Sequence, residues 1–387
     1  MRILFLSNMY PSQADPVGGI FVRKEILSIQ QCDEIDDIKV VVPVLRTLPF
    51  SKKEKAARSP LADSTFTEKL HYISAPSWRF PWIAGTSIGV QFQRIIDTYN
   101  PDIIHIHTVF PCSLALLHIK KPDCPVVITT HGSDWYKAIK REPTKRELIK
   151  AMKKADRIFA VGDKLRSDIV VACPELESKI RVRHHGIDGD AFPLVTDRKK
   201  WKEKAGLNTD QPVILCVANR NAEKGIDVLL EAVSLSENLK KARVIIIGKK
   251  GTDVYERDLQ SIIKTQGLHE IRFVDALKPD ALFPWYAAAD VYVQPSRSEG
   301  FGIAILEAAS TGCPIVATRS GGPEQTVSEA MGVLVESENP AKLMQALENV
   351  LLTQKYPPKK IRASVLERFG AEKAVRELMD EYGELVI

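Results

Sequence analysis

Two glutamates in the second half of the chain, Glu299 and Glu307, are candidates for binding a ligand, because nearby glycines leave the backbone accessible to it. Glu299 lies in the segment SRSEGFGIAILEA, after a strand-like run and before a helix-like run, with Gly300 and Gly302 beside it. Glycines let main-chain N–H groups reach a ligand, and the amino end of a helix favours an anion. Glu307 falls about one turn into the expected helix, where a carboxylate can accept hydrogen bonds from a diol. The segment therefore predicts a binding site for a sugar, a phosphate and a ribose.

Each of these glutamates also has an ordinary explanation when it is taken alone. A glutamate beside a glycine turn is commonly a solvated cap, and a glutamate within a helix commonly lies on the surface. The spacing of Glu299 and Glu307, with seven residues between them, is what favours a binding site over these explanations.

Short apolar, β-branched runs alternate with helix-like stretches, which is typical of parallel sheets covered on both faces. The predicted strands are residues 3–6, 39–44, 103–107, 126–130, 157–161 and 180–183 in the first half, and 212–217, 244–247, 271–274, 291–294, 314–317 and 333–335 in the second. The sequence thus predicts an α/β fold with two doubly wound domains. Their ligand site is expected to face the carboxyl ends of both sets of strands.

A charged segment, residues 188–204, lacks an apolar period and includes Pro193, so we place the domain boundary near Phe192. The predicted domains are residues 1–192 and 193–367. Residues 368–387 are predicted to form an amphipathic helix, and packing back on the first domain is one arrangement for it.

Composition indicates an ordinary globular protein, with 44% hydrophobic and 27% charged residues in 387. The opening MRILFLSNMYP has too short an apolar run for a signal peptide, and no stretch reaches the length of a membrane-spanning helix. Six scattered cysteines favour reduced thiols over disulfides or a zinc site. We expect a cytoplasmic protein whose membrane contact, at the inner face of the cell membrane, is at most peripheral.

The second half resembles a known enzyme family. The segment SEGFGIAILEA looks like the E-x7-E motif of family 4 retaining glycosyltransferases with the GT-B fold. Further similar residues lie at positions 273–275, 287–290, 312–317 and 321–324. The resemblance implies two Rossmann-like domains that face a central cleft.

The resemblance also implies roles for individual residues around this motif. Glu299, Gly300, Phe301 and Gly302 would hold the donor-sugar hydroxyls and phosphate, and Glu307 would bind the ribose hydroxyls. The resemblance implies no cofactor, and the nucleotide sugar is a substrate.

Cations are needed near the donor diphosphate, since negative charge grows on it as the glycosidic bond breaks. Lys224, in VANRNAEKG, matches the family lysine that neutralises the phosphates. Asn219 occupies the usual place of the family arginine, and Arg220 follows one position later. Arg220 is therefore a candidate only if the loop differs from the family pattern.

The first half contributes four more candidates by resemblance. Gly18 and Gly19 match a family loop that approaches the donor phosphate or the acceptor, which we favour over the alternative of a turn that simply needs positive φ. His131, in HGSDWY, matches a histidine near the reacting sugar, with Asp134 as a weaker companion. A lone histidine at a strand end is otherwise often structural.

A possible metal motif, Asp188-Gly189-Asp190, has the D-x-D form that metal-dependent glycosyltransferases of another fold use on a diphosphate. It lies in HHGIDGDAF, which resembles the family's interdomain segment instead. We expect no metal requirement.

The function implied is retaining transfer of a sugar from a UDP- or GDP-sugar to a hydroxyl of a glycan or lipid-linked glycan. A nucleotide-sugar 2-epimerase, or a non-catalytic binding protein of the same fold, is the alternative. The opening, with Asn8, Pro11 and residues 19–22, is similar to bacterial transferases of cell-surface polysaccharide synthesis of the teichuronic-acid type.

Basic residues concentrate in the first half, most densely in residues 137–154, with a second run at residues 51–58. Together with the aromatic residues of 78–82, they suit an anionic membrane interface that carries the acceptor, but a solvated surface explains them too. We expect no nucleic-acid partner.

Overall fold

The computed structural model describes residues 1–12, 18–46, 67–73, 80–353 and 355–386. Its contacts divide the chain into two compact units, one of Met1–Gly186 with Glu372–Ile387 and one of Ile187–Ala371. The sequence placed the division after Phe192 instead. Ile187 already belongs to the second unit because its N–H donates to the Phe369 carbonyl at 2.7 Å, and the Ala371 N–H donates to the Ile187 carbonyl at 3.0 Å.

The first unit contains a seven-stranded parallel sheet in the order β3-β2-β1-β4-β5-β6-β7. Its strands are β1 (Arg2–Ser7), β2 (Asp37–Arg46), β3 (Thr67–Ile73), β4 (Ile103–His107), β5 (Val126–Thr130), β6 (Arg157–Ala160) and β7 (Ile180–Val182). The central strands are buried along their whole length, as the continuous apolar runs predict.

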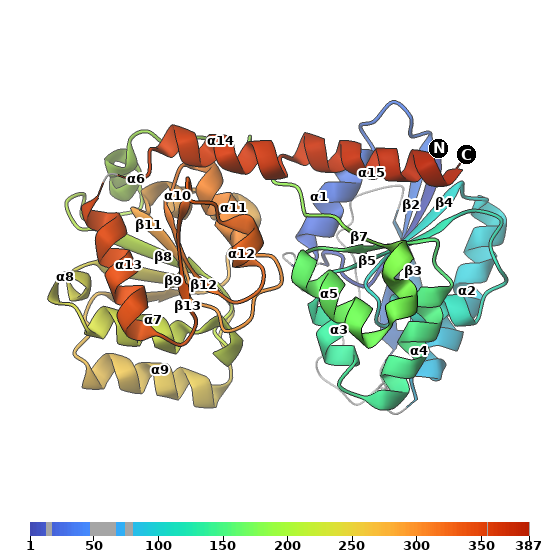
Figure 1. Cartoon of the computed structure of the whole chain (residues 1–387), viewed down its shortest axis with the longest axis horizontal. Coiled ribbons are helices and arrows are strands. Elements are labelled where there is room, and N and C mark those ends of the chain that lie inside the picture. The colour runs from blue at the N-terminus through green and yellow to red at the C-terminus, as the bar shows by residue number, and fades with distance from the viewer. Residues whose placement is uncertain (13–17, 47–66, 74–79, 354, 387) are drawn as a thin grey trace. The chain divides into compact units, whose positions relative to one another are not determined.

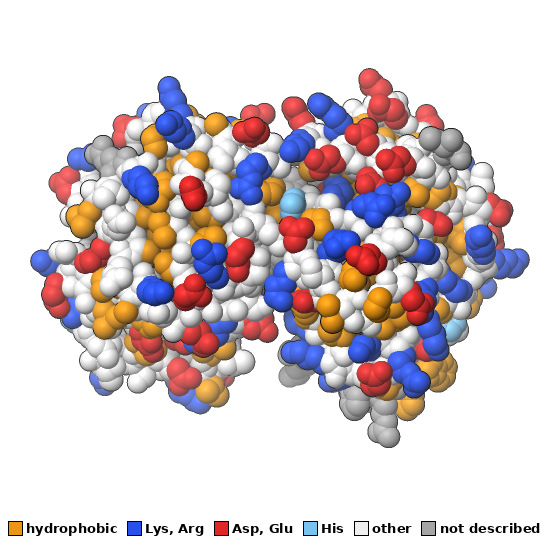
Figure 2. All heavy atoms as spheres, viewed as in Figure 1, with side chains coloured by type: hydrophobic (Ala, Val, Ile, Leu, Met, Phe, Trp, Pro, Cys, Tyr) orange, Lys and Arg blue, Asp and Glu red, His pale blue; other side chains and the backbone are white. Residues whose placement is uncertain are grey.

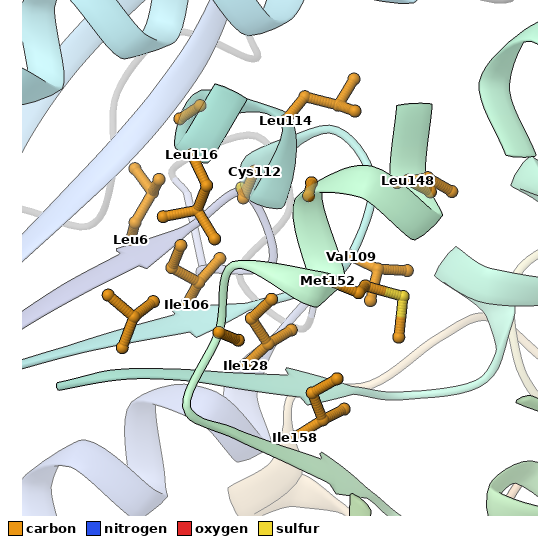
Figure 3. Packing of buried hydrophobic residues seen from close by; sticks show 14 of the residues in the cluster. Leu6, Ile106, Val109, Cys112, Leu114, Leu116, Ile128, Leu148, Met152 and Ile158 are labelled. Carbon is orange, nitrogen blue, oxygen red and sulfur yellow. The ribbon is translucent and has the colours of Figure 1, made fainter. Parts of the chain in front are cut away.

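Helices cover both faces of this sheet (Figure 1). They are α1 (Ile20–Ile29), α2 (Pro81–Tyr99), α3 (Ser133–Ala138), α4 (Glu142–Lys153), α5 (Asp163–Ala172) and α15 (Ala371–Val386), with the 3-10 helices η1 (Cys112–Leu117) and η2 (Pro174–Lys179). On one face, side chains from successive strands meet residues of η1 and α4 (Figure 3), among them Leu6, Ile106, Ile128, Leu116 and Met152.

The other face of the first sheet is covered by α1 and by α15, which returns from the far end of the chain. Leu378 and Tyr382 of α15 are fully buried in a cluster with Phe5 and Phe159 of the sheet. Burying an apolar side chain of this size contributes about 1.5–3 kcal/mol. Arg157 also pairs with Glu381 of α15.

The second unit contains a six-stranded parallel sheet in the order β10-β9-β8-β11-β12-β13. Its strands are β8 (Val213–Val217), β9 (Arg243–Ile247), β10 (Ile271–Val274), β11 (Val291–Gln294), β12 (Ile315–Arg319) and β13 (Gly332–Glu336). Its helices are α6 (Arg198–Lys204), α7 (Ile226–Ser234), α8 (Glu237–Lys240), α9 (Asp253–Thr265), α10 (Phe283–Ala288), α11 (Ile303–Ser310), α12 (Pro323–Thr326), α13 (Pro340–Leu352) and α14 (Pro358–Phe369), with η3 (Ala222–Lys224) and η4 (Pro279–Ala281).

The predicted fold of two doubly wound α/β units is confirmed by these two sheets. All twelve predicted strands are present within a few residues of their expected bounds. The sequence missed β3, an edge strand with the letters TEKLHYI in which only Leu70 is buried. The charged residues of β3 break the apolar pattern by which strands were predicted, because an edge strand needs few apolar side chains.

The end of the chain differs in detail from the single helix expected over residues 368–387. The helix α14 ends at Phe369, Gly370 follows in an extended conformation, and α15 begins at Ala371. Residues of α15 from Glu372 onward belong to the first unit.

Candidate functional site

The backbone at Glu299 is fixed between two loops of the second unit. Its N–H donates to the Ser320 carbonyl at 3.0 Å, and the Gly322 N–H donates to the Glu299 carbonyl at 2.8 Å. A Cβ on Gly322 would lie 2.6 Å from the Phe301 backbone, so glycine is required for this approach. The loop after β11 is therefore held firmly where it leads into α11.

The Glu299 carboxylate collects three polar side chains. Its Oε2 lies 2.8 Å from Lys224 Nζ and accepts from Gln294 Nε2 at 3.0 Å, with Ser296 Oγ at 3.5 Å. The Lys224 and Glu299 side chains are 23% and 14% exposed, so each can still meet a ligand. The structure thus joins the two residues predicted to act on the donor.

Lys224 reaches Glu299 because the loop after β8 passes very close to the loop after β11. Lys224 ends η3, and its N–H donates to Asn221 Oδ1 at 3.2 Å. Gly225 follows with φ of 62°, and a Cβ there would lie 2.0 Å from the Pro295 carbonyl oxygen. Since β8 and β11 are neighbouring parallel strands, their carboxyl ends bring both loops to one edge of the sheet.

The glycine turn opens the amino end of α11. Gly302 has φ of 92° and caps the helix without a side-chain hydrogen bond, and Gly300 is exposed. Phe301 is only 4% exposed and packs against Phe369, so only its backbone can serve a ligand. Free N–H groups at a helix start bind anions.

Glu307 lies within α11, after its first turn, and is partly buried. Its Oε2 accepts a hydrogen bond from the Tyr286 hydroxyl at 2.7 Å. Burial, followed by the nearby Glu307 charge, raises the pKa of Tyr286 well above its usual value. Tyr286 therefore stays protonated and holds the carboxylate in one orientation.

Arg220 has contacts that differ from those of Lys224. It is 5% exposed, its Nε lies 2.8 Å from Glu256 Oε1, and its Nη1 donates to the Gly248 carbonyl at 3.2 Å. The exposed Asn219 accepts from the Lys249 N–H at 3.1 Å. These contacts engage Arg220 in a buried ion pair, whereas Lys224 pairs with Glu299.

Gly19 begins α1 in the first unit. It has φ of 72°, and a Cβ would lie 2.4 Å from the Met9 carbonyl oxygen, so the close approach to the Met9 backbone requires glycine. Gly18 precedes it and is partly exposed. The backbone conformation and the close approach thus both require glycine at position 19.

His131 follows β5 and is hydrogen-bonded through both ring nitrogens. Its Nε2 lies 3.3 Å from His107 Nδ1, and its Nδ1 lies 3.3 Å from His185 Nε2. Burial, with further contributions from His185, His107 and Arg183, lowers the pKa of His131 well below its usual value. The imidazole is therefore neutral at physiological pH.

Asp134, in α3, supports the backbone beside His131. Its Oδ1 accepts from the His131 N–H at 3.0 Å, and its Oδ2 accepts from the Val109 N–H at 2.7 Å. Burial raises the pKa of Asp134, although these hydrogen bonds oppose the shift. Through these contacts Asp134 stabilises the loop after β5.

Several residues that contact the predicted site residues were not themselves predicted. Gln294 and Ser296 hold Glu299, and His107 and His185 hold His131. One available signal was position, because Gln294 and His107 are the last residues of β11 and β4. Polar side chains at the carboxyl ends of parallel strands commonly line sites.

Asp188 and Asp190 form a turn rather than a pair of free ligands. Asp188 Oδ1 accepts from the Asp190 N–H at 2.9 Å and from the Ala191 N–H at 3.2 Å. Across the described ranges, no three His, Cys, Asp or Glu residues gather as a metal site would require.

Exposed basic residues line α4 and its flanks. Of the basic residues in 137–154, Lys150 and Lys153 pair with glutamates at 2.7 Å and 2.5 Å. Phe80 and Trp82, at the start of α2, are 40% and 54% exposed. On the face shown in Figure 2, Lys and Arg side chains lie among Asp and Glu side chains on both units.

Other parts of the expected membrane surface cannot be placed. Residues 51–58, with Trp78 and Arg79, lie outside the described residues. In the portion of the chain that the structure does describe, helices with the length and apolar character needed to span a membrane are absent.

Most of the chain is similar to known protein families. The family model described as glycosyl transferases group 1 matches residues 197–364, and the model of glycosyltransferase family 4 matches residues 42–191. The chain is 28% identical to the D-inositol 3-phosphate glycosyltransferase of Xylanimonas cellulosilytica over 73% of this chain and 72% of that protein. It is 24% identical to the putative teichuronic acid biosynthesis glycosyltransferase TuaC of Bacillus subtilis, over 99% and 98%.

Solved structures share the fold over the whole chain. Sucrose-phosphate synthase from Thermosynechococcus elongatus superposes with a TM-score of 0.78 at 19% identity, covering 100% of this chain and 99% of that one. HepE from Anabaena, solved in complex with UDP, superposes with a TM-score of 0.76 at 18% identity, covering 100% of both.

Proposed function

The chain belongs to the glycosyltransferases, with family models of this class matched over both halves, and we propose that it transfers a sugar from a nucleotide-sugar donor with retained anomeric configuration. The donor would be a UDP- or GDP-sugar, and the acceptor a hydroxyl of a glycan or lipid-linked glycan. The observation that carries the proposal is the Lys224–Glu299 pair at 2.8 Å, set beside the open start of α11.

The donor chemistry follows from charge and position in the second unit. Lys224, with the N–H groups after Gly302, would stabilise the diphosphate as it leaves. Glu299 would hold sugar hydroxyls, and Glu307, oriented by Tyr286, would accept from the ribose diol. The complex of HepE with UDP supports a uridine nucleotide as the first donor to test.

In the proposed reaction the bond from the anomeric carbon to the phosphate oxygen breaks as the bond to the acceptor oxygen forms on the same face. The departing phosphate oxygen takes the acceptor's proton, through an oxocarbenium-like transition state. A protein nucleophile is then unnecessary. His131 would help to orient the sugar, as the family resemblance implies.

The test of the site is the turnover of Lys224→Ala and Glu299→Ala. We expect each to lower kcat at least about tenfold, because each removes charge placed at the reacting group. Lys250→Ala is the matched control, since Lys250 is 61% exposed and lies 3.7 Å from the surface carboxylate of Asp253. Full activity in either site variant, with folding intact, would refute the assignment.

Metal independence is a separate part of the proposal. The lysine and helix amides would supply the positive charge that a divalent cation supplies elsewhere, so transfer is expected to survive EDTA. An absolute Mg²⁺ requirement would contradict this and favour a metal site at Asp188 and Asp190.

We further propose that the protein works in the cytoplasm at the inner face of the membrane, in synthesis of a cell-surface polysaccharide or glycoconjugate. The relative TuaC supports this pathway class. The exposed basic residues of α4 and the exposed Phe80 and Trp82 suit anionic lipid. Co-sedimentation with phosphatidylglycerol liposomes, but not with phosphatidylcholine liposomes, is expected.

Nucleotide release distinguishes this proposal from the alternatives of the same fold. A transferase releases nucleotide only as fast as an acceptor is supplied, whereas a 2-epimerase changes the sugar without an acceptor and a binding protein releases nothing. Acceptor-independent conversion of the donor would therefore replace the transferase proposal.

A further inference from the structure

Four histidines of the first unit stack in a column in which His105, His107 and His185 are buried and His131 is partly exposed. His105 and His107 come from β4, His131 follows β5, and His185 follows β7. Their ring centroids are 4.3 Å, 5.5 Å and 5.2 Å apart along this order. Phe21 of α1 packs against the last two rings.

Three of these rings are linked by hydrogen bonds as well as by stacking. His107 Nδ1 lies 3.3 Å from His131 Nε2, and His131 Nδ1 lies 3.3 Å from His185 Nε2. A neutral imidazole has one N–H donor and one acceptor nitrogen. The tautomer of His107 therefore determines the tautomers of His131 and His185 in turn.

Glu25 of α1 stands at the His107 end of this chain. Its Oε1 lies 3.7 Å from His107 Nε2, while Arg183 Nη1 donates to its Oε2 at 2.8 Å. Among the residues with described positions, neither Oε1 nor His107 Nε2 has any hydrogen-bond partner. An ionised carboxylate only accepts, so it favours a proton on the ring nitrogen that faces it.

The charges around Glu25 keep this carboxylate ionised. Burial raises the pKa of Glu25, but the charge of Arg183, which also donates a hydrogen bond to the carboxylate, opposes burial, and the pKa is lowered overall. Burial also lowers the pKa of His107 to about 4, against an opposing effect of Glu25. At neutral pH the carboxylate is therefore charged and the column is neutral.

We propose that Glu25 is a positioning residue for the sugar transfer, an inference that rests on the function proposed above. Its carboxylate places the proton on Nε2 of His107, and through the two hydrogen bonds on Nε2 of His131 and His185. His131 is then held in one neutral form and one ring orientation. A ring that alternated between tautomers would meet the sugar in the wrong form part of the time.

The Glu25→Gln variant changes the tautomer without removing the side chain. The Arg183 guanidinium donates only, so it takes the glutamine oxygen and turns the amide NH₂ toward His107. The amide N–H then favours an accepting Nε2 on His107, which would move the His107 proton to Nδ1, and the same change would follow at His131 and His185.

Tyr382→Phe is the matched control. The Tyr382 hydroxyl lies 2.5 Å from His105 Nδ1, and His105 Nε2 lies 2.7 Å from Thr129 Oγ1. His105 therefore touches His107 by stacking and not by a hydrogen bond. This variant loses a buried hydrogen bond of the same column but leaves the Glu25 to His185 chain intact.

The experiment combines kinetics with ¹⁵N NMR of the full-length, histidine-labelled protein, whose ring ¹⁵N shifts distinguish the two tautomers. Wild type is expected to show Nε2–H on His131, and Glu25→Gln to show Nδ1–H. Glu25→Gln should lower kcat about tenfold with little change in the donor KM, since the donor is held by the second unit. Glu25→Asp should restore much of the rate, and Tyr382→Phe should keep both tautomer and kcat.

Three results would overturn the proposal: Nδ1–H on His131 in wild type, an unchanged tautomer in Glu25→Gln, or an equal loss of kcat in Tyr382→Phe. The tautomer of His131 is measured first on the wild type, so it tests the proposal even if Glu25→Gln does not fold. If wild type transfers no sugar, the proposed function fails while the tautomer measurement still stands, so the two failures are distinct.

Discussion

The buried histidines should make the first unit sensitive to acid, and His185 allows a direct measurement. His185 is 7% exposed. Burial, as the largest cause, lowers its pKa to about 4, although Glu25 opposes the shift. In the unfolded chain the pKa returns to about 6.5. Between these values the unfolded chain binds a proton that the folded protein does not, so stability is complete above about pH 6.5 and falls as the pH drops toward 4.

The size of the effect follows from the two pKa values. For one imidazole with a pKa of about 6.5 unfolded and about 4 folded, lowering the pH from 7 to 5 reduces the free energy of unfolding by about 2 kcal/mol. His107, whose pKa is also lowered to about 4, acts in the same direction. His185→Gln should therefore remove about 2 kcal/mol of the acid sensitivity and leave the rest.

The assay is a urea titration at pH 7 and pH 5, read by pulsed hydrogen exchange and mass spectrometry. Peptides from β4 and β5 then report the first unit separately from the second. His269→Gln is the control, because His269 is exposed and lies in the second unit. An equal loss of stability in wild type and His185→Gln would show that the folded protein binds a proton at His185 well above pH 5, and would refute the reasoning.

Two further predictions concern the second unit. Gly225→Ala should destabilise it by about 1–3 kcal/mol and lower kcat, because the new Cβ would lie 2.0 Å from the Pro295 carbonyl oxygen; an unchanged melting temperature would show that the loops can separate freely. Glu256→Gln should destabilise the protein more than Arg220→Gln, by about 1–3 kcal/mol, because it removes the ion-pair partner of the buried Arg220 side chain, whereas Glu256 is partly exposed and keeps the Gly251 N–H. A stable Arg220→Gln variant with a raised donor KM would instead support the role of Arg220 as a phosphate ligand.

Part of the site was predictable because the topology of parallel sheets is predictable. Lys224 and Glu299 lie 75 positions apart, yet each follows a strand of one sheet, so both had to reach the same edge. The motif alone did not reveal that Gly225 permits the contact. That requirement depends on how closely two loops pass, which local sequence patterns do not record.

The less predictable features depend on tertiary partners. Arg220 looks the same in sequence whether it meets a phosphate or Glu256, and only packing decides between them. The histidine column needs the register of β4, β5 and β7 as well as the position of α1, which brings Glu25 to His107. Each histidine alone gives no hint of its neighbours.

The return of α15 to the first unit has a consequence for biosynthesis. Residues 372–387 leave the ribosome after all of the second unit, about 10 to 40 s after residue 186 at usual rates of translation. Until then the sheet face that Leu378 and Tyr382 cover stays open, and Arg183 lacks the Ala374 carbonyl to which it donates. The unit made first is thus expected to finish folding last, and nascent chains that stop before residue 372 should need chaperone protection on that face.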